Sequence, residues 1–218
     1  MRKILVVCAH PDDETLGLGG TIAAHAKNGD KVYVLILTEG VSGRGKTNFV
    51  KRENQARRAC SILGTQDPQF LNYPDQKLDT IPLIELSRHI EHEISKWGPE
   101  TVYSHYWGDA NQDHKKTFEA TLVAVRPKPS FSVKRFICFE TPSSTEWGNV
   151  GFHPNLFVDI EDTQKIKMKA LQKYKDEVRG FPHPRSRTAL ISRARYWGST
   201  VGIKHAEAFL LLRELIKK

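Results

Sequence analysis

The chain contains few cysteines and no Cys-x-x-Cys pair. Its three cysteines, Cys8, Cys60 and Cys138, are far apart along the 218 residues. An odd number of widely spaced thiols gives no sign of a disulfide framework or of a zinc site built from thiolates. We therefore expect a cytoplasmic protein, in which thiols stay reduced.

Long hydrophobic runs are also absent. The first apolar run, residues 4–8, is followed at once by His10 and two aspartates, which is too early for a secretory signal peptide. No other stretch approaches the roughly 20 apolar residues that a membrane-spanning helix needs. The sequence therefore predicts no transmembrane segment.

Basic residues outnumber acidic ones, and the formal net charge is +8. A positive surface favours anionic partners such as phosphorylated substrates, nucleic acid or an anionic membrane. However, the basic residues are spread along the chain, with only a modest concentration in residues 163–218, and no nucleic-acid-binding motif accompanies them. We therefore expect a solvated basic face, and we do not expect nucleic acid to be a partner.

Apolar runs alternate with amphipathic segments along most of the chain. Buried strands are predicted at residues 3–8, 31–37, 70–73, 101–106, 134–139 and 156–160. Helices are predicted at residues 14–28, 48–63, 81–97, 115–125 and 162–178, over about 14 residues after the loop 179–187, and at 205–218. This order predicts an α/β, Rossmann-like fold, with a mostly parallel sheet and helices on both faces, in a single domain over residues 1–218.

The segment Ala9–Glu14 reads Ala-His-Pro-Asp-Asp-Glu and follows the first predicted strand. His10 and Asp13 offer a nitrogen and an oxygen ligand to one divalent cation, a combination that suits zinc. Asp12, between them, remains available for acid–base chemistry. The acidic residues could instead form the first turn of a helix, where the macrodipole stabilises carboxylates, so a metal site needs a third ligand elsewhere.

A second polar loop, residues 106–114, follows the predicted strand 101–106 and ends in His114. Because parallel strands end at one edge of a sheet, His114 can approach His10 and Asp13. Two imidazoles and one carboxylate, with a position left for water, are the ligand set of a hydrolytic zinc site. The loop also begins like an EF-hand, but His114 and Ala120 stand where calcium binding needs glycine and glutamate.

Together these segments resemble the zinc-dependent N-deacetylases of the PIG-L/LmbE family. The similarity spans nearly the whole chain and includes further matching segments, namely Arg52-Glu53, Pro154–Ile160, Lys169 with Tyr174, Pro184–Ser186 and His205–Phe209. It implies a Rossmann-like fold without a dinucleotide and one zinc per chain, or another divalent metal. It also implies a metal-dependent amidohydrolase that removes the N-acetyl group, a linear amide, from an N-acetylglucosamine-type sugar or sugar conjugate, giving free amine and acetate.

The same resemblance implies a role for individual residues. The metal ligands would be His10, Asp13 and His114, the general base would be Asp12, and Arg52 would contact the substrate. Beyond the resemblance, we also expect Asn111 and Asp113 to be substrate-binding residues. Several family members have a histidine at position 111, whereas the neutral amide of Asn111 can hydrogen-bond a carbonyl but cannot act as a cationic acid. Asp113 could also orient a neighbouring ligand. His183 and Arg185, in the loop 179–187, could close over the sugar, but loop histidines are mostly solvated and both residues are left out of the catalytic set.

The main alternative is a Rossmann-type nucleotide-binding protein without hydrolase activity. It is suggested by Gly17 and Gly19 after the first strand and by Glu39 about 20 residues later. The third glycine of that fingerprint is replaced by Ile22, and the acidic loop lies where a pyrophosphate would bind. We therefore favour the hydrolase. The sequence leaves open which N-acetyl sugar is the substrate, whether another amide or an ester is cleaved, and whether the chain forms a homo-oligomer.

Overall fold

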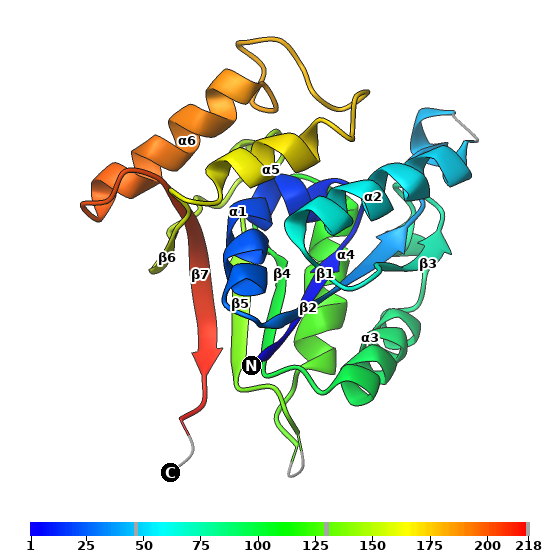
Figure 1. Ribbon diagram of the computed structural model, residues 1–218. Helices are drawn as coiled ribbons and strands as arrows, with labels where there is room; N and C mark the ends of the chain where they lie inside the picture. The colour runs from blue at the N-terminus through cyan, green and yellow to red at the C-terminus, as the bar shows by residue number, and fades with distance from the viewer. Residues whose placement is uncertain (46–47, 129–130, 217–218) are drawn as a thin grey trace.

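A seven-stranded sheet forms the centre of the molecule in the computed structural model, which describes residues 1–45, 48–128 and 131–216 (Figure 1). The strand order is β3-β2-β1-β4-β5-β7-β6. The strands are β1 (Lys3–Cys8), β2 (Lys31–Thr38), β3 (Gln69–Tyr73), β4 (Thr101–His105), β5 (Arg135–Phe139), β6 (Leu156–Asp159) and β7 (Ala206–Glu214). Neighbouring strands from β3 to β5 pair in parallel, whereas β7 is antiparallel to both β5 and β6.

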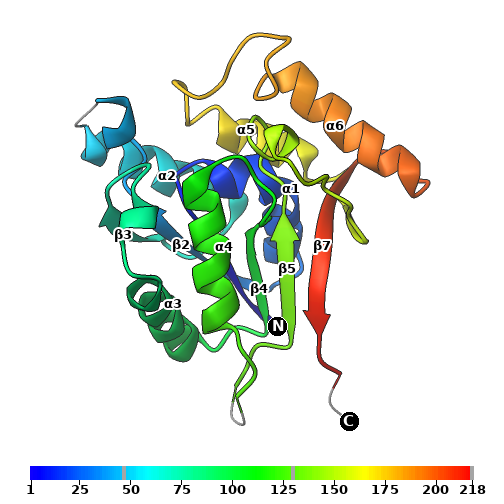
Figure 2. The same ribbon diagram turned by 180° about the vertical axis from the view of Figure 1, so that it is seen from behind.

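Six α-helices in the described part of the chain accompany the sheet. They are α1 (Asp13–Lys27), α2 (Phe49–Leu63), α3 (Leu83–Trp97), α4 (Gln112–Ala124), α5 (Gln164–Leu171) and α6 (Arg187–Thr200). Helices α1, α2 and α5 cover one face and α3 and α4 the other, while α6 lies beside α5 and β7 (Figures 1 and 2). The predicted α/β fold, a mostly parallel sheet with helices on both faces, is confirmed.

The alternation of side chains along β1 explains the two layers. Ile4, Val6 and Cys8 pack into the core beneath α1 and α2, whereas Leu5 and Val7 pack into the core beneath α3 and α4. All five are fully buried. Because a central parallel strand is covered on both faces, it appears in the sequence as a continuous apolar run.

The C-terminal prediction was wrong. Residues 205–218 were expected to form a helix; of these, residues 217–218 lie outside the described part of the chain. Instead β7 hydrogen-bonds to β5 on one side and to β6 on the other, and Phe209 packs against Tyr103. Pairing along both edges, with burial of Phe209, outweighs the local propensity, which is a weak preference in any folded protein.

The predicted basic helix 162–178 is also shorter than expected. It ends at Leu171, and the chain continues irregularly to α6. In this irregular segment Tyr174 and Glu177 are buried. The remaining predicted helices and strands are present, with their ends shifted by a few residues. Among the described residues, no helix has the length and apolar character needed to cross a membrane.

Candidate metal centre and active site

The three predicted metal ligands lie together at the carboxyl ends of the central strands. His10 and Asp13 follow β1, and His114 is in the first turn of α4, which begins after β4. His10 Nδ1 is 3.2 Å from His114 Nε2, and His114 Nε2 is 3.4 Å from Asp13 Oδ1. All three side chains are buried. Residues 104 positions apart in the sequence thus present their donor atoms to one point.

These separations fit a bound divalent cation. A tetrahedral zinc ion with bonds of about 2.0–2.2 Å holds its ligand atoms about 3.3–3.6 Å apart. Asp13 Oδ1 is buried, and no donor among the described residues hydrogen-bonds to it. A buried carboxylate oxygen facing two imidazole nitrogens is stabilised by a cation between them. The donor set therefore suits zinc or a similar metal.

Asp113 fixes the orientation of His10. Its Oδ2 lies 3.1 Å from His10 Nε2, and its carboxylate also accepts hydrogen bonds from the backbone N–H groups of Gln76 (2.8 Å) and Leu78 (3.0 Å). Asp113 is fully buried and does not line the pocket above His10. Its contacts favour the orienting role over direct contact with substrate, because they turn His10 Nδ1 towards the other two ligands.

Asp109 holds His114 in the same way. Its Oδ1 is 3.1 Å from His114 Nδ1, and its carboxylate accepts hydrogen bonds from the hydroxyls of Ser144 and Thr145. Burial alone would lower the pKa of His114, but the carboxylates of Asp13 and Asp109 raise it to about 9. The centre therefore attracts positive charge, which a divalent cation would supply in place of the proton.

His105, at the end of β4, supports the centre and was not predicted. The backbone N–H of Ala9 donates to its Nε2 (3.0 Å), and its Nδ1 lies 3.1 Å from Thr141 Oγ1. Burial, together with the charge of His114, lowers the pKa of His105 to about 4, so it stays neutral. Its ring stacks on the His114 ring, with centroids 3.9 Å apart.

Asp12 lies beside the metal ligands in an unusual backbone conformation. Its φ of 120° is rarely adopted by residues other than glycine and costs on the order of 1–3 kcal/mol. The conformation is held by Glu14 Oε2, which accepts from the Asp12 N–H at 3.0 Å. The carboxylate oxygen Oδ2 receives hydrogen bonds from Arg52 (3.0 Å) and Arg185 (3.1 Å). Burial raises the pKa of Asp12, although the two guanidinium groups act in the opposite direction.

Arg52 is buried and held by three partners. It donates to Pro11 O at 2.6 Å and to Asp12, and its NH1 lies 3.4 Å from Glu177 Oε1. Asn111 is the N-cap of α4, and its Oδ1 accepts from the N–H of Asp113 at 2.8 Å. Both residues, which were predicted to bind substrate, line the pocket above His10. Their hydrogen bonds also hold other parts of the site in place.

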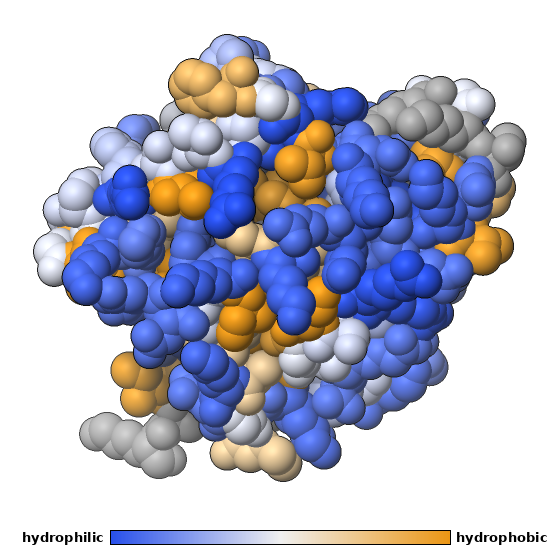
Figure 3. Space-filling model, turned by 45° about the horizontal axis from the view of Figure 1, so that its top comes forward, coloured by the Kyte–Doolittle hydropathy of each residue, from blue (hydrophilic) through white to orange (hydrophobic). Residues whose placement is uncertain are grey.

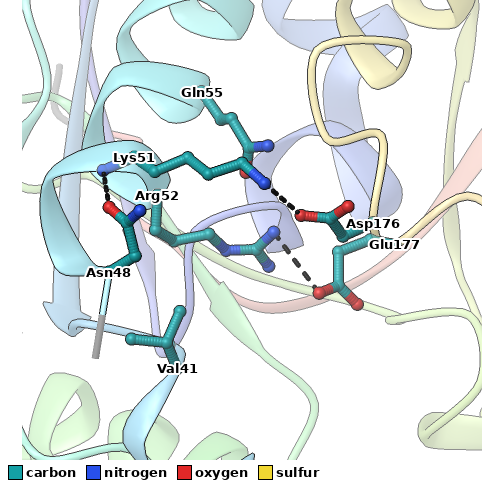
Figure 4. A pocket seen from close by; sticks show the side chains of 8 residues that line it. Val41, Asn48, Lys51, Arg52, Gln55, Asp176 and Glu177 are labelled. Atoms are coloured by element: carbon teal, nitrogen blue, oxygen red, sulfur yellow. Dashed lines mark hydrogen bonds and ion pairs between the residues drawn. The ribbon is translucent and has the colours of Figure 1, made fainter. Parts of the chain in front are cut away.

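Two adjoining cavities lie here. The one above the metal ligands, about 40 Å³, is lined by His10, Asp12, Gly40, Arg52, Asp75, Gln76, Asn111 and Arg185. The second, about 280 Å³, shares Gly40 and Arg52 with it. Figure 4 shows Lys51 of α2 directed towards Asp176, 3.0 Å away, and Arg52 directed towards Glu177. The larger cavity is therefore bordered by charged side chains of both signs.

The sequence interpretation gave no role to Asp75, Gln76 and Glu177, which line these cavities, and it left Arg185 out of the catalytic residues. Asp75 follows β3, and its Oδ1 lies 3.2 Å from His10 Nε2. Glu177 and Arg185 come from the irregular segment between α5 and α6, and Arg185 NH1 lies 3.0 Å from Glu177 Oε2. Two signals had marked Arg185, namely its loop rich in proline and arginine and its place in the family-matching segment Pro184–Ser186.

The fold and site define an α/β protein with a His–Asp–His centre at the carboxyl edge of its sheet. Residues 5–125, more than half of the chain, match the family model PIG-L, described as GlcNAc-PI de-N-acetylase. The chain belongs to this family. The relationship that the sequence resemblance implied is therefore confirmed.

Individual relatives agree with this family. The uncharacterized deacetylase YaiS of Escherichia coli (strain K12) is 31% identical over 180 residues, which cover 80% of this chain and 91% of YaiS. Diacetylchitobiose deacetylase of Thermococcus kodakarensis is 29% identical over 226 residues, which cover 95% of this chain and 82% of that enzyme. The crystal structure of the conserved protein TT1542 from Thermus thermophilus has a TM-score of 0.82 at 26% identity, with 100% of this chain and 98% of that chain covered.

Proposed function

We propose that the protein is a metal-dependent N-deacetylase that hydrolyses the N-acetyl group of an N-acetylglucosamine-type sugar or sugar conjugate. The observation that carries this proposal is that Asp12, held by two arginines, adjoins the cluster of His10, Asp13 and His114 at one small pocket. The names of the family model and of the Thermococcus kodakarensis relative, which specify removal of acetyl groups from amino sugars, support the substrate class.

In this mechanism His10, Asp13 and His114 would hold zinc or another divalent ion. When bound there, such an ion polarises an amide carbonyl and lowers the pKa of a water molecule towards about 7. Asp12 is the general base. Because both arginines bind its Oδ2, we assign proton transfer to Oδ1, which accepts a proton from the attacking water and returns it to the leaving nitrogen.

Asn111 and Arg52 would position the substrate. The Oδ1 of Asn111 is used to cap α4, which leaves its amide N–H groups to donate to the acetyl carbonyl or to the oxyanion formed from it. Arg52 borders both cavities, so its guanidinium can contact the substrate while it holds Asp12. The larger cavity provides room for the remainder of a sugar conjugate.

We also propose that residues 1–218 act as one deacetylase domain in the cytoplasm. Glu177 and Arg185 lie outside the matched residues 5–125, yet they contact Arg52 and Asp12 within the site. A chain truncated after the matched residues would therefore lose contacts to the general base. The three cysteines are free and buried, which agrees with a reducing compartment.

The nucleotide-binding alternative is not favoured, because packing accounts for the glycines of α1. A Cβ atom at Gly17 would collide with the ring of Phe139, one at Gly19 would lie 3.1 Å from Cγ of Lys167, and one at Gly20 would lie 2.8 Å from the side chain of Ile160. These glycines thus let α1 approach β5 and the residue after β6 closely. They need no phosphate to explain them.

The test is an assay of acetate and primary amine released from N-acetylglucosamine, diacetylchitobiose and N-acetylglucosaminyl conjugates. The protein is purified without chelator, then treated with chelator and reconstituted with zinc. We expect release from at least one substrate, loss on chelation and recovery with zinc, with Asp12→Asn as the inactive control. No release from any substrate by metal-loaded protein would contradict the proposal.

A further inference from the structure

A second candidate binding site lies on the outside of the molecule, in a groove of about 330 Å³ between α5 and α6. The residues that line it are Gln164, Lys165, Met168, Lys169, Gln172, Arg187, Ile191, Arg195 and His205. None of these is an aspartate or glutamate. Figure 3, in which the side of α5 and α6 is turned forward, shows small hydrophobic areas bordered by hydrophilic side chains.

Four cations border the groove without acidic partners. Lys165 and Lys169 lie one turn apart on α5, and Arg187 and Arg195 lie two turns apart on α6. All four are exposed, and among the described residues none of them forms an ion pair. In contrast, Arg193 on the same helix is paired with Glu140. The positive charge around the groove is therefore available to an anion.

The floor of the groove is apolar. Met168 and Ile191 belong to the hydrophobic cluster between α5 and α6. Beside them, Gln164 is only 8% exposed, and neither its side-chain oxygen nor its nitrogen has a hydrogen-bond partner among the described residues. His205 Nδ1 is also buried and has no hydrogen-bond partner among the described residues. Since buried polar groups almost always have partners in folded proteins, these atoms point to a ligand.

We propose that this groove binds a small organic phosphate. Arginine and lysine side chains would hold the phosphate, because the guanidinium fork matches its oxygen atoms. Met168 and Ile191 would contact the apolar body of the ligand, and the Gln164 amide can both donate to it and accept from it. A concave apolar floor with a few convergent polar groups is typical of small-molecule sites. The inference does not depend on the deacetylase activity.

The test is a calorimetric titration of the metal-loaded protein with phenyl phosphate, which combines a phosphate with an apolar ring. Inorganic phosphate, which lacks the ring, and phenol, which lacks the phosphate group, serve as comparisons. We expect saturable binding of phenyl phosphate, at least about tenfold weaker binding of inorganic phosphate, and no measurable binding of phenol. Equal affinities for the two phosphates, or binding only to anionic lipid vesicles, would overturn the proposal.

Two double variants of equal charge locate the site. Lys169→Gln with Arg195→Gln removes two cations of the groove, whereas Lys31→Gln with Arg88→Gln removes two exposed cations outside it. We expect the first to weaken phenyl phosphate binding at least about tenfold and the second to change it less than about twofold. Equal losses would indicate general electrostatic attraction, and an unchanged affinity in the groove variant would place the ligand elsewhere; either result would overturn the proposal.

Gln164→Leu separates ligand binding from a structural role. Removing a buried amide that lacks partners should raise the melting temperature. If the amide contacts the ligand, the same variant binds phenyl phosphate several-fold more weakly. A more stable protein with weaker binding supports the site, and an unchanged affinity contradicts it.

Discussion

Lys167 and Glu207 form a buried ion pair across a break in helix α1, with Nζ 2.6 Å from Oε1. The break is at Leu18, whose φ of −145° is not helical. Lys167 donates to Leu16 O at 2.9 Å, and Glu207 accepts from the backbone N–H groups of residues 20–21 at 3.0 and 2.7 Å. The pair thus satisfies backbone groups that the interrupted helix leaves free, and it fixes the first turn of α1, which carries Asp13.

We expect Glu207→Gln to destabilise the protein by about 3 kcal/mol, because it leaves the buried Lys167 without its counter-charge. Lys204 and Glu161 provide a matched control, since they are also 2.6 Å apart but exposed. Glu161→Gln should therefore cost much less, because solvent screens an exposed pair. Urea unfolding of both variants measures the difference, and equal losses would show that burial of the first pair has no consequence.

Asp12→Asn should abolish most of the activity and leave the metal in place. The carboxylate is not a member of the ligand cluster, and loss of a general base typically slows turnover 10²–10⁴-fold, here about 10³-fold. Steady-state rates of acetate release and elemental analysis of the same preparation check the two parts. A variant with near-normal turnover would remove Asp12 from its role.

Tyr174→Phe should impair catalysis through Glu14. The Tyr174 hydroxyl donates to Glu14 Oε1 at 2.6 Å, and Glu14 Oε2 holds the strained Asp12 N–H. We expect kcat to fall about fivefold with little change in KM, since one hydrogen bond contributes about 1 kcal/mol. Tyr103→Phe, which removes a buried hydroxyl paired with His25, is the control and should leave kcat unchanged. Similar kcat values in both variants would contradict this positioning role.

Metal affinity should increase with pH. Burial alone would lower the pKa of His114, but Asp13 and Asp109 raise it to about 9, so below that pH a proton occupies the nitrogen that the metal needs. The apparent affinity for zinc should therefore rise up to about tenfold per pH unit between about pH 6 and 8. Titration in chelator-buffered zinc at several pH values measures this slope. An affinity that is flat or falls over this range would contradict a raised pKa of His114.

The sheet, and the approach of the two polar loops at residues 9–14 and 106–114, could be predicted from the sequence because both depend on local patterns. Residues 4–8 are an uninterrupted apolar run, and the polar residues that follow them must lie at the carboxyl edge of a parallel sheet. His10 and His114 each follow such a strand. Their approach therefore required only the right strand order, in which β1 and β4 are neighbours.

Other parts could not be predicted from local patterns. Residues 206–214 have a helical composition, and only the exposed edges of β5 and β6 make them a strand. Glu177 and Arg185 reach the site because α5 ends at Leu171 and the irregular chain that follows brings Glu177 beside Arg52 of α2 (Figure 4) and Arg185 beside Asp12. Asp109 and His105 likewise hold the proposed metal ligand His114 through contacts that form only after folding.

The most direct test of the metal centre is elemental analysis of wild-type protein, His114→Ala and His92→Ala, purified side by side without chelator. His92 is an exposed histidine on α3 and serves as the control. We expect about one zinc or other divalent ion per chain in the wild type and in His92→Ala, and strongly reduced metal in His114→Ala. Equal metal in all three proteins, or none in the wild type even after zinc is added, would contradict this expectation.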